Sequence, residues 1–387
     1  MTLNFKTTYL KAIRERYFMA TKAEKSLILD ELCEVTGYNR KWAIRVLAKS
    51  HKTGPKFSGR KKQYSEHAMY HLKRLWHILG RINSKKMVAA FPVWLDFYDR
   101  QDFNEEIRAE IMSMSHATID RYLQKYRNQF ARRKRTGTQR AKTFLKTIPI
   151  KEMDFKSQKP GSFQADTVAH CGNSLSGTFI WSLTVTDEYS GWTENRAIYG
   201  KNGGTVTGAF ASILWSLPFK AHQINTDNGT EFINDQLQKF LVEDQKLKFT
   251  RSRAYKKNDN AHVEQKNFTH VRELFGYDRF DKEELTFVMN EIYKDYFNVL
   301  WNFFIPQQKC IKVERVGSRY RRAYDIPKTP YQRLIESAEL SVYQKEQLKE
   351  KYKTLNPIEL RREINDQLAR FKRIIESKSE FKYKFAA

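Results

Sequence analysis

Three consecutive strand-like segments begin near residue 160, and they constrain the fold of the middle of this chain more than any other feature. SFQADTVAH alternates, TFIWSLTVT places Phe179, Trp181, Leu183 and Val185 on one face, and WTENRAIY follows a turn as a third strand. Helix and strand patterns then follow in turn as TVTGAFASILWSL, AHQINTD, EFINDQLQKFLVED and LKFTRS. This order predicts an α/β domain with a mixed five-stranded sheet, in which the first and fourth strands are neighbours.

Three carboxylates occupy positions that such a sheet would bring together. Asp166 lies inside the first strand, Asp227 ends the fourth, and Glu264 lies near the start of the next helix. Each has a plainer interpretation on its own: an exposed strand residue, part of an ordinary Asp-Asn-Gly turn, and a solvated helix residue. Their joint order and spacing favour one shared site at the sheet edge.

A site made of three carboxylates needs a cation, because the side chains repel one another. Mg²⁺ prefers carboxylate oxygens and keeps water positions that phosphate oxygens can take. Two such ions, about 3.5–4 Å apart, can activate an attacking oxygen and stabilise a leaving one. We therefore predict that Asp166, Asp227 and Glu264 bind two Mg²⁺ ions, for which Mn²⁺ is expected to substitute.

Other residues near these segments receive lesser roles. Asp187 and Glu188 also follow a strand, but the first and fourth strands already supply the adjacent aspartates, so we interpret this pair as turn residues. His170 shares the strand face of Asp166 and is an auxiliary candidate. Phe268 is expected to pack on the sheet from the helix that carries Glu264.

The charge of the chain points to a polyanionic partner. Lys and Arg number 70 against 44 Asp and Glu, a formal net charge of +26. The excess lies in residues 1–150 and 301–387, whereas the middle of the chain is close to neutral. Basic flanks around a neutral centre favour double-stranded DNA as the partner.

A helix-turn-helix pattern occupies residues 26–48. Leu27, Leu29, Leu32 and Val35 give the first helix its apolar side, Gly37 supplies the turn, and Trp42, Ile44, Val46 and Leu47 are the apolar positions of the second. An ordinary helical hairpin is the alternative. The predicted DNA contacts of the second helix are Arg40, Lys41 and Arg45.

A second helical unit follows a basic Gly/Pro linker. Helical spacing covers 65–79, 84–100, 104–113 and 115–127, and we interpret the last helix as a recognition helix. Its predicted DNA contacts are His116, Thr118, Arg121 and Lys125.

Further DNA contacts are predicted in charge runs outside the two helical units. They are Arg132, Arg133, Lys134 and Arg135 in the linker, and Lys256, Lys257, Asn260 and Lys266 around Glu264. Residues 131–142 and 307–322 are interpreted as long flexible cationic segments that reach DNA held mainly by a partner subunit.

These patterns divide the chain into six segments, and none carries an apolar run long enough to span a membrane. The predicted boundaries are 1–50 and 64–130 for the helix-turn-helix units, 51–63 and 131–158 for basic linkers, 159–300 for the catalytic core, and 301–387 for a basic, mainly helical C-terminal region. The absence of a signal-peptide pattern predicts a cytoplasmic, nucleoid-associated protein.

Three motifs resemble a known family. FQADTVAHCG, TDNGTEF and KNDNAHVEQKN are similar to the DDE transposases of bacterial insertion sequences, which have a catalytic core of the retroviral-integrase type. The resemblance covers about residues 163–275, and the later NFFIPQQKCIKVERVGSRYRRAYD, TPYQRLI and LNPIELRREI resemble the C-terminal portion of one such group.

This resemblance implies a ribonuclease-H-like fold and a metal-binding triad of Asp166, Asp227 and Glu264. It also implies cleavage at transposon ends and joining to target DNA by an assembly of at least two subunits. Two alternatives stay open: an inactive transposase that serves as a DNA-binding regulator, and a ribonuclease-H-like nuclease.

Overall fold

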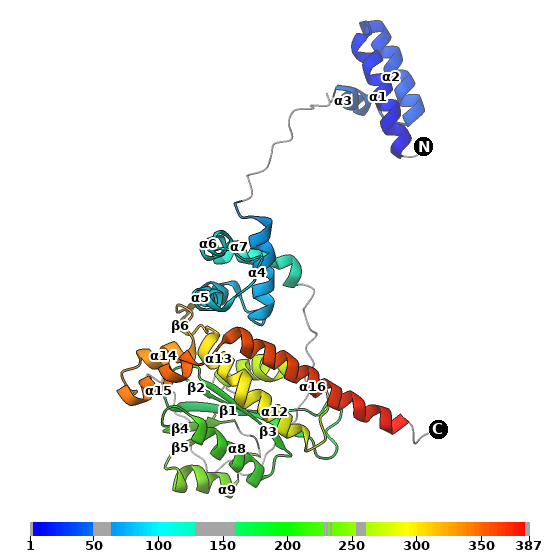
Figure 1. Ribbon diagram of the computed structural model, residues 1–387. Helices are drawn as coiled ribbons and strands as arrows, with labels where there is room; N and C mark the ends of the chain where they lie inside the picture. The colour runs from blue at the N-terminus through cyan, green and yellow to red at the C-terminus, as the bar shows by residue number, and fades with distance from the viewer. Residues whose placement is uncertain are drawn as a thin grey trace. The chain divides into compact units, whose positions relative to one another are not determined.

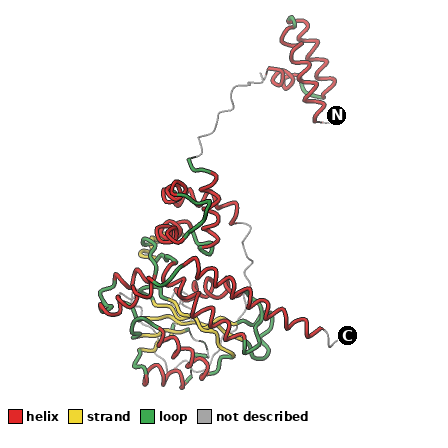
Figure 2. The backbone as a smooth tube through the Cα atoms, viewed as in Figure 1, coloured by secondary structure: helices red, strands yellow, loops and turns green. Residues whose placement is uncertain are grey.

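The protein consists of two compact units, divided between Gln63 and Tyr64. The computed structural model describes residues 3–48, 63–127, 159–227, 229, 231–232, 234–252 and 261–383. Figure 1 shows the helices and strands in chain order, and Figure 2 separates them by type.

The N-terminal unit is made of three helices: α1 (Leu3–Met19), α2 (Lys22–Thr36) and α3 (Arg40–Ala48). Thr21 and Glu24 form a capping box that fixes the start of α2. Gly37, at φ 73°, ends α2 in the left-handed region that glycine adopts without strain. The predicted pair of helices around Gly37 is confirmed.

The apolar faces of these two helices differ from the predicted ones. The core of the unit is formed by Ile13, Ile28, Leu29, Leu32, Ala43 and Leu47. Leu27 is 69% exposed and Trp42 is 44% exposed, and Val35 and Ile44 also face solvent. The cause is helical spacing: the buried positions of α2 and α3 recur every three or four residues, and the exposed ones fall outside that stripe.

The second unit begins with four α-helices, close to the predicted ranges. They are α4 (Glu66–Ile78), α5 (Ser84–Trp94), α6 (Glu105–Ser113) and α7 (His116–Arg127). Ser65, Asn83 and Asn104 each cap the start of a helix through a side-chain oxygen. The helix predicted for 84–100 is shorter, because it tightens into a 3₁₀ turn at Leu95–Phe97 and ends there.

The central sheet has five strands in the order β3-β2-β1-β4-β5. They are β1 (Ser162–Ala169), β2 (Ile180–Asp187), β3 (Thr193–Tyr199), β4 (Gln223–Thr226) and β5 (Lys248–Arg251). β1, β2 and β3 pair antiparallel, whereas β4 and β5 run parallel to β1. This confirms the predicted mixed sheet of ribonuclease-H-like order, with the first and fourth strands side by side.

Helices cover both faces of this sheet. α8 (Gly203–Ser216) and the short α9 (Asp235–Gln238) lie on one side in Figure 1, and α12 (Leu285–Glu291) and α13 (Asn298–Phe304) lie on the other. α12 and α13 are joined by a π-helical segment, Ile292–Phe297. The helix after β5 is α10 (Ala261–Lys266), which continues through the π-helical segment Asn267–Arg272 into α11 (Glu273–Phe275).

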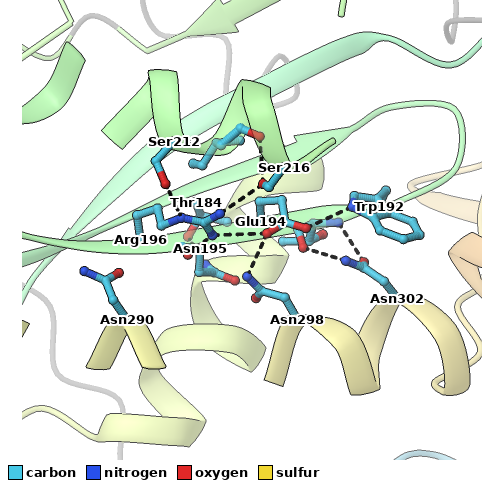
Figure 3. A network of polar contacts seen from close by, with 12 residues as sticks. Thr184, Trp192, Glu194, Asn195, Arg196, Ser212, Ser216, Asn290, Asn298 and Asn302 are labelled. Atoms are coloured by element: carbon cyan, nitrogen blue, oxygen red, sulfur yellow. Dashed lines mark hydrogen bonds and ion pairs between the residues drawn. The ribbon is translucent and has the colours of Figure 1, made fainter. Parts of the chain in front are cut away.

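The outer edge of β3 is hydrogen-bonded by two asparagine side chains. Asn302 Oδ1 accepts from the Thr193 amide at 2.9 Å, and its Nδ2 donates to the Thr193 carbonyl at 2.9 Å. Asn290 pairs with the amide and carbonyl of Ala197 in the same way, at 2.8 and 2.9 Å. Figure 3 shows both asparagines beside the strand. Each side-chain amide therefore takes the place of a peptide group in a sixth strand.

The C-terminal part contains a feature that the sequence analysis missed. Residues 307–322 were expected to be a flexible segment, but β6 (Cys310–Val316) and β7 (Arg319–Tyr324) pair as an antiparallel hairpin. The expectation was wrong because charge obscured the alternating pattern. Three helices follow, as predicted for 331–375: α14 (Pro330–Glu336), α15 (Val342–Lys353) and α16 (Pro357–Tyr383).

One continuous hydrophobic core joins the second helical group, the sheet and the C-terminal helices. Trp94 on α5 donates from Nε1 to the carbonyl of Phe304 at the end of α13, at 3.0 Å. The boundaries predicted inside this unit remain predictions. Among the described helices, none combines the length and apolar character that a membrane span requires.

Candidate active site

The register of the sheet places Asp166 next to the end of β4. Ala165 of β1 pairs with Thr226, the last residue of β4, and Asp166 and Asp227 are the next residue along each of these two parallel segments. Asp227 Oδ1 accepts a hydrogen bond from the Gly229 amide at 2.9 Å, which holds the carboxylate in the turn. The predicted convergence of these two strands is therefore present.

Two neighbours fix the orientation of the Asp166 carboxylate. Its Oδ1 accepts from the Thr167 amide at 2.8 Å, and its Oδ2 accepts from Asn267 Nδ2 at 2.6 Å. Asn267 lies one helical turn after Glu264, so the helix that carries Glu264 contacts the first carboxylate of the site directly.

The pKa of Asp166 is affected by burial and by several nearby acidic groups. Burial and then the negative charge of Asp227 raise the pKa of Asp166 well above its ordinary value, and Glu231 and Glu264 add to this rise. The hydrogen bond from Thr167 opposes it. Since a cation would reverse this repulsion, the site is one where positive charge is strongly favoured.

Glu264 is the exposed member of the three carboxylates. The Val263 amide, one residue earlier, donates to Gln164 Oε1 at 3.4 Å, which ties α10 to β1. Within the described residues, no three His, Cys, Asp or Glu side chains lie close enough to hold a metal ion as they stand. By donor chemistry the carboxylates suit Mg²⁺. A shared ion would draw Glu264 toward the two aspartates.

A second polar cluster adjoins the aspartates, and the sequence analysis did not identify it. Buried Glu231 accepts from Thr167 Oγ1 at 2.6 Å and forms an ion pair with Lys201 at 3.3 Å. The Lys201 ammonium lies 4.7 Å from the centre of the Trp181 ring. The available signal was position: Glu231 stands four residues after Asp227 within TDNGTEF, but only the folded chain brings Lys201 to it.

The remaining acids and the histidine of this region have structural surroundings. Asp187 accepts from the Gly161 amide at 2.8 Å and from the Ser190 amide at 2.7 Å, as a turn residue would. Glu188 accepts from Gln164 Nε2 at 2.7 Å. His170, the auxiliary candidate, is buried with Nε2 2.8 Å from Ser182 Oγ, so its ring is engaged in the core.

The predicted DNA contacts on α3 and α7 lie mostly on exposed surfaces. Lys41, Arg45, His116, Arg121 and Lys125 are exposed.

Two other predicted contacts are held within their own helical units. Arg40 forms an ion pair with Asp30 and donates to Ser26 Oγ at 2.5 Å. Thr118 is half-buried, and its hydroxyl oxygen lies 3.3 Å from Arg121 Nη2.

Two predictions around Glu264 need correction. Lys266, expected to contact phosphate, is buried, with Nζ donating to Gln307 Oε1 at 2.5 Å and lying 5.7 Å from the centre of the Trp301 ring. Phe268, expected to pack on the sheet, is 43% exposed. The π-helical segment that starts at Asn267 shifts the helix face at Phe268, whereas Lys266 precedes it on α10 and is buried against Gln307 and Trp301.

Seven of the predicted DNA contacts lie outside the described residues. They are Arg132, Arg133, Lys134, Arg135, Lys256, Lys257 and Asn260.

Comparison with known proteins identifies a recognised domain, whose matched range includes Asp166 and Asp227 and ends before Glu264. The integrase core domain family matches residues 156–257. The chain is 34% identical over 334 residues to the uncharacterized protein y4rM of Sinorhizobium fredii (strain NBRC 101917 / NGR234), and the match covers 85% of this chain and 94% of that protein.

Two solved structures are also similar over a limited region. The catalytic core domain of BIV integrase covers 28% of this chain at 15% identity, with a TM-score of 0.23. The HTLV-2 integrase catalytic core domain, solved in complex with magnesium in a dimeric form, covers 28% at 22% identity, with a TM-score of 0.22. The matches span 64% and 66% of those chains, less than two thirds of either.

Proposed function

Because the chain belongs to the same family as the y4rM protein of Sinorhizobium fredii and contains an integrase core domain, we propose that it is a DDE transposase. The integrase core domain supports a polynucleotidyl transferase in general. The observation that carries the finer proposal is the placement of Asp166 and Asp227 on adjacent parallel strands, with the helix of Glu264 in contact with Asp166 through Asn267.

The residues of the site have two roles: some would bind metal ions, and others orient the metal-binding carboxylates. Asp166, Asp227 and Glu264 would hold two Mg²⁺ ions, which when bound supply activation of an attacking oxygen and stabilisation of a leaving oxygen. Thr167 and Asn267 orient Asp166 through the hydrogen bonds described above. Glu231 keeps Lys201 beside the aspartates, where the ammonium group can face a DNA phosphate.

Two phosphoryl displacements make up the proposed reaction. In the first, a water oxygen forms a bond to phosphorus at the element's end, and the bond to the 3′ oxygen breaks. In the second, the freed 3′-hydroxyl attacks a target phosphodiester, and a target 3′ oxygen leaves. No covalent intermediate with the protein is formed, so positioning and charge stabilisation are the work of the protein.

The helical units supply the DNA recognition in this proposal. The exposed side chains of α3 and α7 read the element's ends, and the surplus positive charge follows the phosphates. At least two subunits hold the two ends together, because one carboxylate site acts on one phosphodiester at a time. The protein acts in the cytoplasm on the bacterial nucleoid.

The test uses the full chain and a plasmid that carries the DNA flanking its gene, including any inverted repeats. We expect Mg²⁺-dependent cleavage at the repeats and joining to a second DNA. Asp227→Asn should abolish both while leaving binding to the repeats intact. Wild-type protein that binds the repeats but never cuts them would instead support a regulator. Cleavage of RNA–DNA hybrids without any dependence on the repeats would support a nuclease.

Subunit cooperation has its own test. An Asp227→Asn subunit is mixed with an Arg121→Ala/Lys125→Ala subunit, each of them inactive alone. Activity returns in the mixture if a subunit cuts the end that its partner reads, and stays absent if each cuts the end it reads. Light scattering that finds a single chain on a DNA complex able to join both ends would contradict the assembly.

A further inference from the structure

The β6–β7 hairpin is a two-stranded ribbon whose side chains are exposed. Every residue from Ile311 to Tyr324 is exposed, and the two strands pair only with each other. Gly317, at φ 61°, gives the turn between Val316 and Arg319 the positive φ that a two-residue hairpin turn requires. A hairpin without a third strand or a packed face is marginally stable in water, so its persistence in solution calls for a partner.

The register divides the ribbon into two faces of different chemistry. One face, called here the arginine–tyrosine face, carries Val313, Arg315, Tyr320, Arg322 and Tyr324, because Val313 pairs with Arg322 and Arg315 pairs with Tyr320. It has no acidic side chain.

The opposite face carries Glu314, the acidic residue of the ribbon. Lys312, Glu314, Val316, Arg319 and Arg321 lie there, and Lys312 forms an ion pair with Glu314.

The base of the ribbon is anchored firmly in the second unit. Gln307 and Lys328 exchange two backbone hydrogen bonds, at 2.9 and 3.1 Å. Asp325, just after β7, accepts from the Lys309 amide at 2.6 Å and forms an ion pair with Arg333 at 2.8 Å. These contacts fix the base of the ribbon to the second unit.

The same anchor reaches the candidate active site. Gln307 Oε1 accepts from buried Lys266, which lies two residues after Glu264 on α10. The residue at the base of the ribbon is therefore in direct contact with the helix that carries Glu264.

We propose that the β6–β7 ribbon enters a groove of duplex DNA with its arginine–tyrosine face toward the base pairs. The proposal rests on the proposed function only in taking DNA as the polyanion. The major groove of B-DNA, about 12 Å wide, admits a two-stranded ribbon. Arginine forks match phosphate oxygens and guanine edges, and tyrosines contact sugars and bases. The face that bears Glu314 points away from the DNA, since a carboxylate there would be repelled by phosphate.

The choice of face can be tested by two variants that remove equal charge. Arg315→Ala/Arg322→Ala changes the arginine–tyrosine face, and Arg319→Ala/Arg321→Ala changes the opposite face. Both are made in the full chain with Asp227→Asn, so that no DNA is cut. Binding to a random-sequence duplex and to the matching single strand is measured by fluorescence anisotropy over a range of salt concentrations.

We expect the first variant to bind the duplex roughly 10- to 100-fold more weakly and to lower the salt slope by about 2. The second should bind within about 3-fold of its parent, because exposed charges turned to solvent contribute little. A Tyr320→Ala/Tyr324→Ala variant keeps every charge and should also weaken duplex binding. Because the mutated side chains are exposed, thermal unfolding should be unchanged in all three.

Several outcomes would overturn the proposal. Unchanged duplex binding in the first variant removes DNA as the occupant. Equal losses in the two arginine variants show a diffuse charge effect without a preferred face, and a loss confined to the single strand rules out the groove. These results are independent of the proposed function: a protein without strand-joining activity can still show the face-specific loss, and an active transposase can lack it.

Discussion

Glu194 on β3 and Asp166 on β1 are carboxylates of the same sheet with opposite surroundings. Glu194 accepts hydrogen bonds from Trp192, Arg196 and Asn298 at 3.0, 3.1 and 3.0 Å, and it is buried beside the Arg196 guanidinium (Figure 3). Asp166 has acidic groups as its strongest electrostatic neighbours, and within the described residues no Lys or Arg forms an ion pair with it.

The difference lies in whether the surrounding residues balance the charge of the carboxylate. Arg196 is itself fully engaged, since Nε donates to Ser212 Oγ and Nη2 to Ser216 Oγ, at 3.1 and 3.0 Å. The fold thus completes the surroundings of Glu194 from its own residues. Around Asp166 the described residues gather negative charge, and a bound cation would supply the positive charge that balances it. An unbalanced acidic group in a well-ordered sheet is the stronger indication of a binding site.

The largest expected effect is on the rate of strand joining, when Asp166 and Glu194 are neutralised in separate variants. Asp166→Asn should lower strand joining on the order of 10³-fold or more, because a ligand of the metal ions is lost. Glu194→Gln should leave the rate per folded molecule within about 3-fold, since this side chain acts only on stability. The measurement is strand joining normalised to the folded fraction by circular dichroism. A similar loss of rate in both variants would erase the distinction.

Removal of the cation beside Glu194 should produce the next largest effect. Arg196→Met leaves a buried carboxylate without its partner and should cost about 3–5 kcal/mol in the free energy of unfolding. Arg370→Met is the matched control, because the Arg370–Glu291 pair at 3.5 Å is largely exposed and should contribute about 0–1 kcal/mol. Urea unfolding measures both variants. Equal values would show that the Glu194 network contributes no more than a surface pair.

Addition of Mg²⁺ should stabilise the folded protein through Asp166 and Asp227, and Glu194 should not contribute to this gain. At about 100 times its dissociation constant, a bound ion stabilises the folded state by about 2.7 kcal/mol. We expect this gain in wild-type protein and in Glu194→Gln, and its loss in Asp166→Asn/Asp227→Asn. Thermal unfolding with and without Mg²⁺ reports it. The site assignment fails if the double variant is stabilised as much as the wild type.

The smallest expected effect concerns Asp187, whose surroundings are intermediate between those of Glu194 and Asp166. It is buried and hydrogen-bonded, and burial raises its pKa to about 6. A carboxyl group with a raised pKa in the folded state stabilises the protein when protonated, so stability should fall as the pH rises from about 4 to about 6, by roughly 1–3 kcal/mol. Asp187→Asn should flatten this part of the curve, and an unchanged pH slope would show that another group titrates there.

The sheet and the two aspartates were predictable because alternation and chain order are local signals. Strand order alone predicts that Asp166 lies beside Asp227, and the conformational freedom of Gly37 predicts a turn between two helices. Long-range contacts were not predictable. Lys201 meets Glu231 only in the folded chain, and Lys266 is buried through its contact with Gln307, far away in the sequence.

Two local features also escaped prediction, for physical reasons. The basic residues of Cys310–Tyr324 resembled a solvated charge run, although its β-branched and aromatic positions alternate in a way that suits a ribbon. Leu27 and Trp42 were assigned to the core because they are apolar, but hydrophobic side chains on a small three-helix unit outnumber the places that its core can offer.

The asparagines on β3 have a consequence for how copies of this protein can associate. An uncovered edge strand is a template for pairing with a neighbouring chain and thus for sheet-to-sheet polymerisation. Asn290 and Asn302 occupy the backbone positions that an incoming strand would need. An incoming strand therefore cannot pair with β3 at Thr193 or Ala197, which closes this edge to growth of a continuous β-fibre between copies of the protein.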